Sequence, residues 1–230
     1  MARPILLSWS GGKDAAWTLH TLRASPEVEV VALVTTVTSG YDRIAMHGIR
    51  RDLLHTQAAA TGLPVIEATI PPQCDNATYE AAFADALSLA RARWPDCTEI
   101  AFGDLFLDDV RAWREALCAR LGWTPVFPLF GRDTTQLARD MIDGGLQARL
   151  TCVDPRKLDR SFAGRTFDDR LLADLPAGID PCGENGEFHS FAFAGPMFHH
   201  PIPNRVGEVV DRDGFVFADV LLSEPDRLSH

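Results

Sequence analysis

The feature that most limits how this chain can fold is a regular alternation of short apolar runs with longer amphipathic segments through its first 150 residues. Residues 27–37 form one such run, rich in β-branched side chains, which is typical of a buried parallel strand. Residues 77–94 form an amphipathic segment in which Phe83, Leu87 and Ala90 recur at helical spacing and share one face. Strands and helices that alternate with short loops predict an α/β fold, in which a parallel sheet carries helices on both faces.

The same patterns divide the chain into a larger and a smaller part. In the larger part, residues 1–150, the expected strands are 5–7, 27–37, 63–70, 98–105, 124–130 and 146–153. Residues 151–230 are denser in glycine, proline and aromatic side chains, and they predict a smaller α+β C-terminal part. Two alternating apolar runs around Arg212, Asp213 and Gly214 indicate a β-hairpin near its end.

A glycine turn follows the first expected strand. Ser10, Gly11, Gly12 and Lys13 interrupt an apolar run, and a helical stretch begins directly after them. Such a helix directs unpaired N–H groups and the positive end of its dipole at the space above the strand, and Lys13 adds a full charge that we expect to point toward a ligand. These residues predict a phosphate site, although a Gly-Gly turn can also simply join a strand to a helix.

Comparison with known nucleotide-binding sequence patterns indicates which class of phosphate site this loop resembles. The Walker pattern G-x-x-x-x-G-K-[ST] and the dinucleotide pattern G-x-G-x-x-G are both missing here. The stretch Ser10–Asp14 instead matches S-G-G-x-D, and in this it resembles the PP-loop family of ATP pyrophosphatases, which hold the β and γ phosphates of ATP and cut between α and β. Ala15 stands where that family usually has serine, which removes one hydroxyl from the expected phosphate cradle.

A second motif, G-E-N-G-E-F-H-S-F at residues 183–191, places two carboxylates and an imidazole within six residues. In an extended chain, Glu187 and His189 lie on the same side because side chains alternate with a period of two. A carboxylate beside an imidazole can orient a nucleophile, bind Mg²⁺ or hold a cationic substrate. Taken alone, the motif is equally compatible with a glycine turn and a strand that merely expose polar side chains.

Four segments in order are similar to the diphthine-ammonia ligase family of PP-loop enzymes. They are the glycine loop, residues 102–111, residues 128–130 and residues 183–191, and the resemblance extends from residue 5 to about residue 200. It implies that ATP adenylates a carboxylate on an acceptor with release of pyrophosphate. Ammonia then displaces AMP and leaves an amide.

The resemblance also implies roles for individual residues, with ATP and Mg²⁺ as cofactors. Residues 1–150 would be the PP-loop, Rossmann-like ATP-binding domain, and residues 151–230 the smaller part that binds the acceptor. The expected nucleotide contacts are Ser10, Gly11, Gly12, Lys13, His47 and Gly103. The expected catalytic residues are Asp14 and Asp104, which would position metal or water, and Glu184, Glu187 and His189, which would face the acceptor or the ammonia.

Composition argues against two other classes of function, nucleic-acid binding and membrane association. A formal net charge of −10 argues against extensive nucleic-acid binding, because such binding relies on clustered Lys and Arg. No apolar run approaches the roughly 20 residues that span a bilayer, so we expect no membrane association and a cytoplasmic location. The five cysteines include no C-x-x-C pair and are expected to be reduced thiols. The expected partners are ammonia and a carboxylate-bearing acceptor, either a protein side chain or a small molecule, and a homo-oligomer is compatible with the sequence.

Three alternatives stay open at this point. Arginine far outnumbers lysine, which suggests a high-GC bacterial origin, and a bacterial paralogue would act on a different carboxylate acceptor. The chain could instead be a tRNA-modifying PP-loop enzyme, although the acidic balance disfavours it. It could also bind nucleotide without catalysis, a reading that Ala15 supports.

Overall fold

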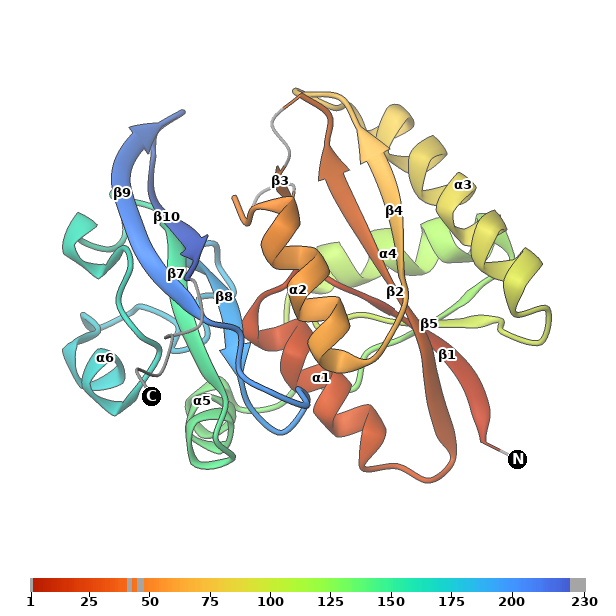
Figure 1. Cartoon of the computed structure of the whole chain (residues 1–230), viewed down its shortest axis with the longest axis horizontal. Coiled ribbons are helices and arrows are strands. Elements are labelled where there is room, and N and C mark those ends of the chain that lie inside the picture. The colour runs from red at the N-terminus through yellow and green to blue at the C-terminus, as the bar shows by residue number, and fades with distance from the viewer. Residues whose placement is uncertain (1, 41–42, 45–47, 224–230) are drawn as a thin grey trace, which may run out of the picture.

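The computed structural model describes residues 2–40, 43–44 and 48–223 (Figure 1). Within them, the larger sheet contains β1 (Arg3–Ser8), β2 (Val28–Thr38), β3 (Arg43–Ile44), β4 (Val65–Ile70), β5 (Glu99–Ala101) and β6 (Thr124–Val126). Five strands run parallel in the order β4-β2-β1-β5-β6, and β3 pairs antiparallel with the end of β2. Because the chain proceeds to β2 on one side of β1 and later returns to β5 on the other, the strand order reverses at β1.

Helices cover both faces of this sheet, as the alternating pattern predicts. The four helices concerned are α1 (Lys13–Arg23), α2 (Arg51–Thr61), α3 (Asn76–Arg93) and α4 (Asp108–Leu121). Strand β1 shows how the faces separate: Ile5 and Leu7 belong to the core with α1 and α2, whereas Leu6 belongs to the core with α3 and α4. On α3, the side chains of Phe83 and Leu87 are buried in that second core, which confirms the predicted helical face.

The smaller sheet lies against the α1 and α2 side. It contains β7 (Gln147–Val153), β8 (Phe188–Ala194), β9 (Asn204–Arg212) and β10 (Phe215–Leu222), antiparallel in the order β8-β7-β10-β9. Two short helices, α5 (Thr134–Asp143) and α6 (Asp169–Asp174), accompany it. The predicted hairpin is confirmed, because Asp213 and Gly214 both have positive φ, 52° and 82°, as a tight hairpin turn of mirror-image type requires.

One expectation about the fold was wrong. We expected residues 146–153 to continue the parallel sheet, but β7 pairs antiparallel with β8 and β10 in the smaller sheet. A short strand that is mostly buried has the same apolar pattern in either kind of sheet, so periodicity could not distinguish them. The division of domains at residue 150 stays a prediction, with the change of sheet falling just before it.

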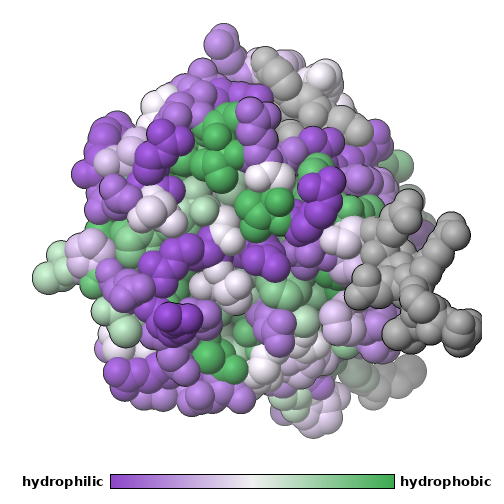
Figure 2. All heavy atoms as spheres, turned by 60° about the vertical axis from the view of Figure 1, so that its left-hand side comes forward, coloured by the Kyte–Doolittle hydropathy of each residue, from purple (hydrophilic) through white to green (hydrophobic). Residues whose placement is uncertain are grey.

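On the side of the molecule that carries the smaller sheet, hydrophobic and hydrophilic residues are mixed at the surface (Figure 2). Figure 2 shows hydrophobic residues there as separate patches among hydrophilic ones. Across the residues that the structure describes, every helix is too short or too polar to cross a bilayer.

Candidate functional site

The glycine loop adopts the predicted strand-turn-helix geometry at the point where the strand order reverses. Gly11 has a φ of 76°, which favours glycine, and Gly12 is extended and precedes the first residue of α1. The N–H of Gly12 donates to Ser10 Oγ at 3.3 Å. In open α/β sheets, ligands bind beyond the carboxyl ends of the strands where the order reverses, and this loop occupies that position.

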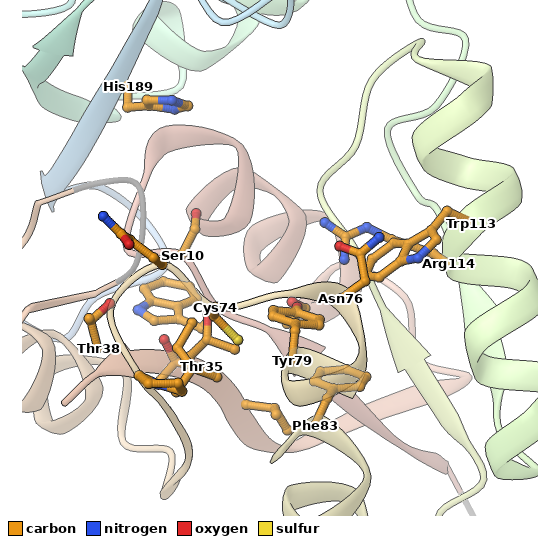
Figure 3. A pocket seen from close by; sticks show the side chains of 17 residues that line it. Ser10, Thr35, Thr38, Cys74, Asn76, Tyr79, Phe83, Trp113, Arg114 and His189 are labelled. Carbon is orange, nitrogen blue, oxygen red and sulfur yellow. The ribbon is translucent and has the colours of Figure 1, made fainter. Parts of the chain in front are cut away.

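A cavity of about 560 Å³ opens beside Ser10 (Figure 3). Its walls come from the carboxyl ends of β1, β2 and β4, from α3 and α4, and from β8. The lining residues are Ser8, Trp9, Ser10, Val34, Thr35, Thr36, Thr38, Ile70, Pro71, Gln73, Cys74, Asn76, Tyr79, Phe83, Trp113, Arg114 and His189. The volume lies within the range of about 300–1,000 Å³ that is typical of small-molecule sites. Thr35 Oγ1 is buried and has no hydrogen-bond partner among the described residues, so a ligand could supply one.

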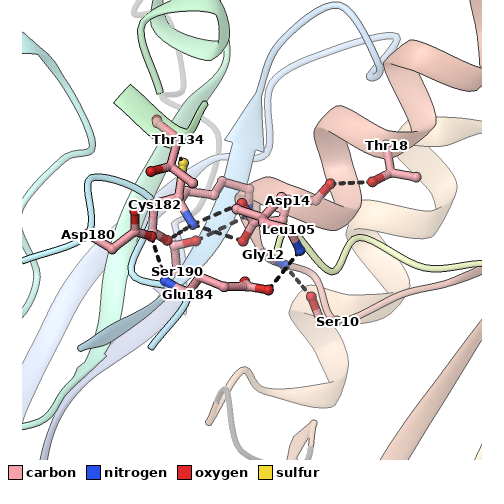
Figure 4. A network of polar contacts seen from close by, with 11 residues as sticks. Ser10, Gly12, Asp14, Thr18, Leu105, Thr134, Asp180, Cys182, Glu184 and Ser190 are labelled. Carbon is pink, nitrogen blue, oxygen red and sulfur yellow. Dashed lines mark hydrogen bonds and ion pairs between the residues drawn. The ribbon is translucent and has the colours of Figure 1, made fainter. Parts of the chain in front are cut away.

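Strand β8 joins the second motif to the glycine loop, although they are far apart in sequence (Figure 4). The N–H of Ala192 donates to the carbonyl of Gly11 at 2.9 Å, and Ser190 Oγ accepts from the N–H of Lys13 at 3.1 Å. Gln57 of α2 strengthens this contact, because its Nε2 donates to the carbonyls of Gly11 and Ala192 at 2.9 and 2.6 Å. The smaller sheet therefore forms one wall of the predicted phosphate site.

The side chain of Lys13 is buried, which contradicts our expectation that it points toward a ligand. Only 2% of it is exposed. Its Nζ donates to both carboxylate oxygens of Asp14, at 2.8 and 3.0 Å, and to the carbonyl of Cys182. The rings of Phe188 and Phe167 lie 5.3 and 5.7 Å from the ammonium. Sequence reasoning missed these partners because three of them come from residues more than 150 positions away.

Glu184 has the properties of a group that exchanges protons near neutral pH. Its Oε1 accepts from the N–H of Leu105, in the loop between β5 and α4, at 2.7 Å, and its own N–H donates to Asp180 Oδ2 at 2.9 Å. Burial raises the pKa of Glu184 to about 7, with the negative charges of Asp14 and Asp104 adding to the effect. A carboxyl with such a pKa can accept or donate a proton at physiological pH.

Glu187 directly precedes β8, so the strand alternation from which we expected it to lie on the same side as His189 does not extend to it. Glu187 is 2% exposed, and its Oε1 accepts from the N–H of Asp180 at 3.3 Å and from Asn185 Nδ2 at 3.1 Å. These bonds hold the turn that presents Glu184. Glu187 Oε2 is buried without a hydrogen-bond partner in the described part of the chain.

His189 reaches the cavity wall from β8. Burial, helped by the nearby charge of Lys13, lowers its pKa to about 4. The imidazole is therefore neutral at pH 7, and Figure 3 shows it on the opposite side of the cavity from Arg114.

Gly103 and Asp104 lie in the loop between β5 and α4, and Gly103 is close to the first turn of α1. A Cβ at position 103 would come within 3.1 Å of the backbone N of Ala15, so glycine permits this close approach. Asp104 is paired with Arg114 of α4, at 2.6 and 3.3 Å. Sequence reasoning missed Arg114, because its direction depends on how α4 packs against β5 rather than on any motif.

The predicted metal ligands are both paired with basic side chains. Asp14 is bonded to Lys13, and Asp104 to Arg114. Within residues 2–40, 43–44 and 48–223, no group of three His, Cys, Asp or Glu residues is arranged to hold a metal ion. His47, predicted to lie near the nucleotide, falls outside the described residues.

Fold and site together define an α/β protein with a PP-loop-like core, in which a glycine loop and a cavity lie where the strand order reverses. Residues 3–125 match the diphthamide synthase N-terminal domain, and residues 133–213 match the diphthamide synthase C-terminal domain. The chain belongs to the diphthamide synthase family, as the resemblance had indicated.

Curated relatives agree with this assignment. The chain is 26% identical over 233 residues to human diphthine-ammonia ligase, covering 92% of this chain and 86% of the human protein. It is 26% identical over 219 residues to the fission yeast (Schizosaccharomyces pombe) diphthine-ammonia ligase, covering 88% of this chain but only 36% of that protein. The zebrafish protein of the same name is 31% identical over 127 residues, 53% of this chain and 49% of the zebrafish protein. The chain thus spans most of the human relative and about a third of the fission yeast one.

Proposed function

We propose that this chain is an ATP-dependent amide-forming ligase of the diphthine-ammonia type. In this reaction, a carboxylate of the acceptor attacks the α phosphorus of ATP and pyrophosphate leaves. Ammonia then attacks the acyl carbon of the adenylate, and AMP leaves as the amide forms. The names of the relatives support diphthine as the acceptor, and a different carboxylate is the alternative.

The observation that carries the proposal is the contact between β8 and the glycine loop. Ser190 Oγ bonds to the N–H of Lys13, and the N–H of Ala192 bonds to the carbonyl of Gly11. A phosphate loop alone would support any nucleotide-binding function. A phosphate loop joined to a segment that presents a carboxyl of pKa about 7, Glu184, supports nucleotide chemistry coupled to proton transfer.

The cavity suits the nucleoside part of ATP. The rings of Tyr79 and Trp113, whose centroids lie 5.6 Å apart, offer an aromatic wall for a purine base. Thr35 Oγ1 is available to a polar group of the ligand. We place the phosphates at the backbone of Ser10, Gly11 and Gly12 and at the first turn of α1, where backbone N–H groups and the helix dipole favour anions.

Proton transfer is the step that we assign to Glu184. Ammonia that attacks an acyl carbon must lose a proton, and an ionised Glu184 can accept it. Because its pKa is about 7, a substantial fraction is ionised at neutral pH. His189 is neutral there, and we propose that it orients the acceptor by hydrogen bonding.

Asp14 fits Mg²⁺ better than Asp104 does. Its side chain remains 26% exposed, and proteins commonly bind this ion through one or two carboxylates together with substrate phosphates. Mg²⁺ bound in this way would stabilise the charge that develops on pyrophosphate. Both carboxylates are engaged through both oxygens by a basic side chain, but the side chain of Asp104 is less accessible, at 14% exposed.

Product analysis tests the proposal. Purified protein is incubated with ATP, ammonium and a diphthine-bearing acceptor, and the nucleotides are separated by chromatography. We expect AMP and pyrophosphate in amounts equal to the amide. ADP as the main product would contradict the mechanism, and tight ATP binding without turnover would favour a non-catalytic nucleotide-binding protein.

ATP-pyrophosphate exchange identifies the acceptor. Exchange that requires diphthine supports the acceptor of the relatives, whereas exchange with other carboxylates only would assign the chain to a different acceptor. A transfer RNA panel in the same assay addresses the tRNA-modifying alternative, which the net charge of −10 disfavours.

A further inference from the structure

The cavity contains one strongly basic side chain. Of the seventeen described residues that line it, Arg114 alone carries a full charge at neutral pH, since the pKa of His189 is lowered to about 4. No aspartate or glutamate belongs to this set. A cavity wall with a single arginine and no lining acid is suited to a ligand that carries an oxyanion.

Arg114 is held in a fixed orientation. Its Nε and one terminal nitrogen bond to Asp104 at 2.6 and 3.3 Å, and its guanidinium lies 4.4 Å from the centroid of the Phe102 ring. Asp104 occupies one edge of the guanidinium and the hydroxyl of Tyr79, another lining residue, also engages it, but the group has five N–H donors in all. The side chain is 21% exposed, so it has surface that a ligand can reach, and Figure 3 shows it extending from α4 to the cavity.

We propose that Arg114 is a ligand-binding residue that binds an oxyanion in the cavity, and that Asp104 is the positioning residue that orients the guanidinium. The proposal rests on the function proposed above for the identity of the ligand. Two groups of that reaction share the required chemistry: a phosphate of the nucleotide and the carboxylate of the acceptor. Both match the planar fork of a guanidinium, which bonds to them through two parallel N–H groups.

The test compares Arg114→Gln with Arg111→Gln. Arg111 is one turn earlier on α4, is 42% exposed and pairs with Glu115, and it does not line the cavity, so it is a matched control. Calorimetric titrations with ATP and with adenosine measure nucleotide affinity. The KM for a diphthine-bearing acceptor in the amide assay reports on the interaction with the acceptor carboxylate.

We expect Arg114→Gln to weaken one of these interactions by about ten- to hundredfold, the usual effect of losing a charge-assisted contact. If ATP affinity falls and adenosine affinity is normal, the group that Arg114 binds is a phosphate. If the KM for the acceptor rises and ATP affinity is normal, the group is the acceptor carboxylate. Arg114→Lys keeps the positive charge but lacks the two parallel N–H donors of the guanidinium. We expect it to weaken the same interaction as Arg114→Gln, but to a smaller extent. Asp104→Asn, which leaves the guanidinium in place but weakens its support, should show a smaller loss.

Unchanged ATP affinity together with an unchanged KM in Arg114→Gln would overturn the proposal. So would equal losses in Arg111→Gln, or equal losses of ATP and adenosine affinity, because either result indicates a structural effect. Should Arg114→Gln fail to fold, as judged by its thermal transition, the Arg114→Lys variant decides in the same assays. If wild-type protein makes no amide at all, the proposed function fails, and the ATP titration alone decides the role of Arg114.

Discussion

The ammonium of Lys13 is enclosed by Asp14, a backbone carbonyl and two aromatic rings, so its main partners are within the protein. We predict that Lys13→Met destabilises the fold by about 2 to 4 kcal/mol, because it keeps the apolar stem but leaves the largely buried carboxylate of Asp14 without its cation. Urea unfolding measures this loss. The double variant with Asp14→Asn should recover part of it, since no charge is then left unpaired.

A different outcome would reassign Lys13. If Lys13→Met were as stable as wild type and yet unable to bind ATP, the ammonium would have to leave its buried position when the nucleotide binds. Its predicted role as a phosphate ligand would then be restored.

Glu184 makes stability depend on pH in an unusual direction for a carboxyl. Its pKa rises from 4.5 to about 7 on folding, so between these values the folded state binds more protons than the unfolded state. The free energy of unfolding therefore falls as pH rises through this range. We predict that Glu184→Gln is more stable than wild type at pH 8 and that this advantage disappears near pH 4.5, while amide formation is lost throughout.

Urea unfolding of both proteins across this pH range checks the prediction. The pKa of His189 shifts downward on folding, so His189 contributes the opposite slope. That contribution is common to both proteins and cancels in their difference. A stability difference that does not change with pH would mean that folding does not raise the pKa of Glu184.

Local chemistry could be predicted from the sequence, and contacts between distant segments could not. The loop at Ser10–Gly12 was predictable because glycine spacing after a strand sets its geometry. The burial of Lys13 depends on Cys182 and Phe188, and the orientation of Arg114 depends on Asp104 across a helix-strand contact. No pattern along the chain encodes such partners.

At the scale of elements, the close approach of the loop between β5 and α4 to the first turn of α1 depends on Gly103. We predict that Gly103→Ala destabilises the protein by about 1 to 3 kcal/mol, because its Cβ would press on the backbone of Asp14 and Ala15, which cannot yield as a flexible side chain would. ATP affinity should fall as well, since the first turn of α1 must shift. Thermal unfolding and ATP titration measure the two effects, and Gly103→Val should be worse in both. A stable alanine variant with normal ATP affinity would show that the turn adjusts freely.

Most elements were predictable because each has its own periodicity and end signals. Helix α5, for example, begins after Asp133, whose side chain accepts from the N–H of Gln136, as a capping residue should. The sheet to which β7 belongs was not predictable, because it depends on pairing with β8 and β10, which come later in the chain.

At the scale of the whole molecule, the two sheets are not independent. A single hydrophobic core contains Leu7 of β1 and Leu19 of α1 together with Phe188 and Phe191 of β8 and Val216 of β10. The polar contacts of Lys13 and Gln57 cross the same boundary. Separation of the two parts would therefore expose apolar surface and leave buried polar groups unpaired, and both effects oppose independent unfolding.

We accordingly predict that the chain unfolds in one cooperative transition. All five tryptophans lie within the first 123 residues, so their fluorescence reports on the larger sheet, whereas far-UV circular dichroism reports on the whole chain. The two urea transitions should coincide, and ATP should move both to higher urea by the same amount, because a ligand of the folded state stabilises the entire cooperative unit. Loss of fluorescence at a urea concentration that leaves part of the circular dichroism signal intact would instead reveal two domains. The boundary predicted at residue 150 could then be located by limited proteolysis of the intermediate.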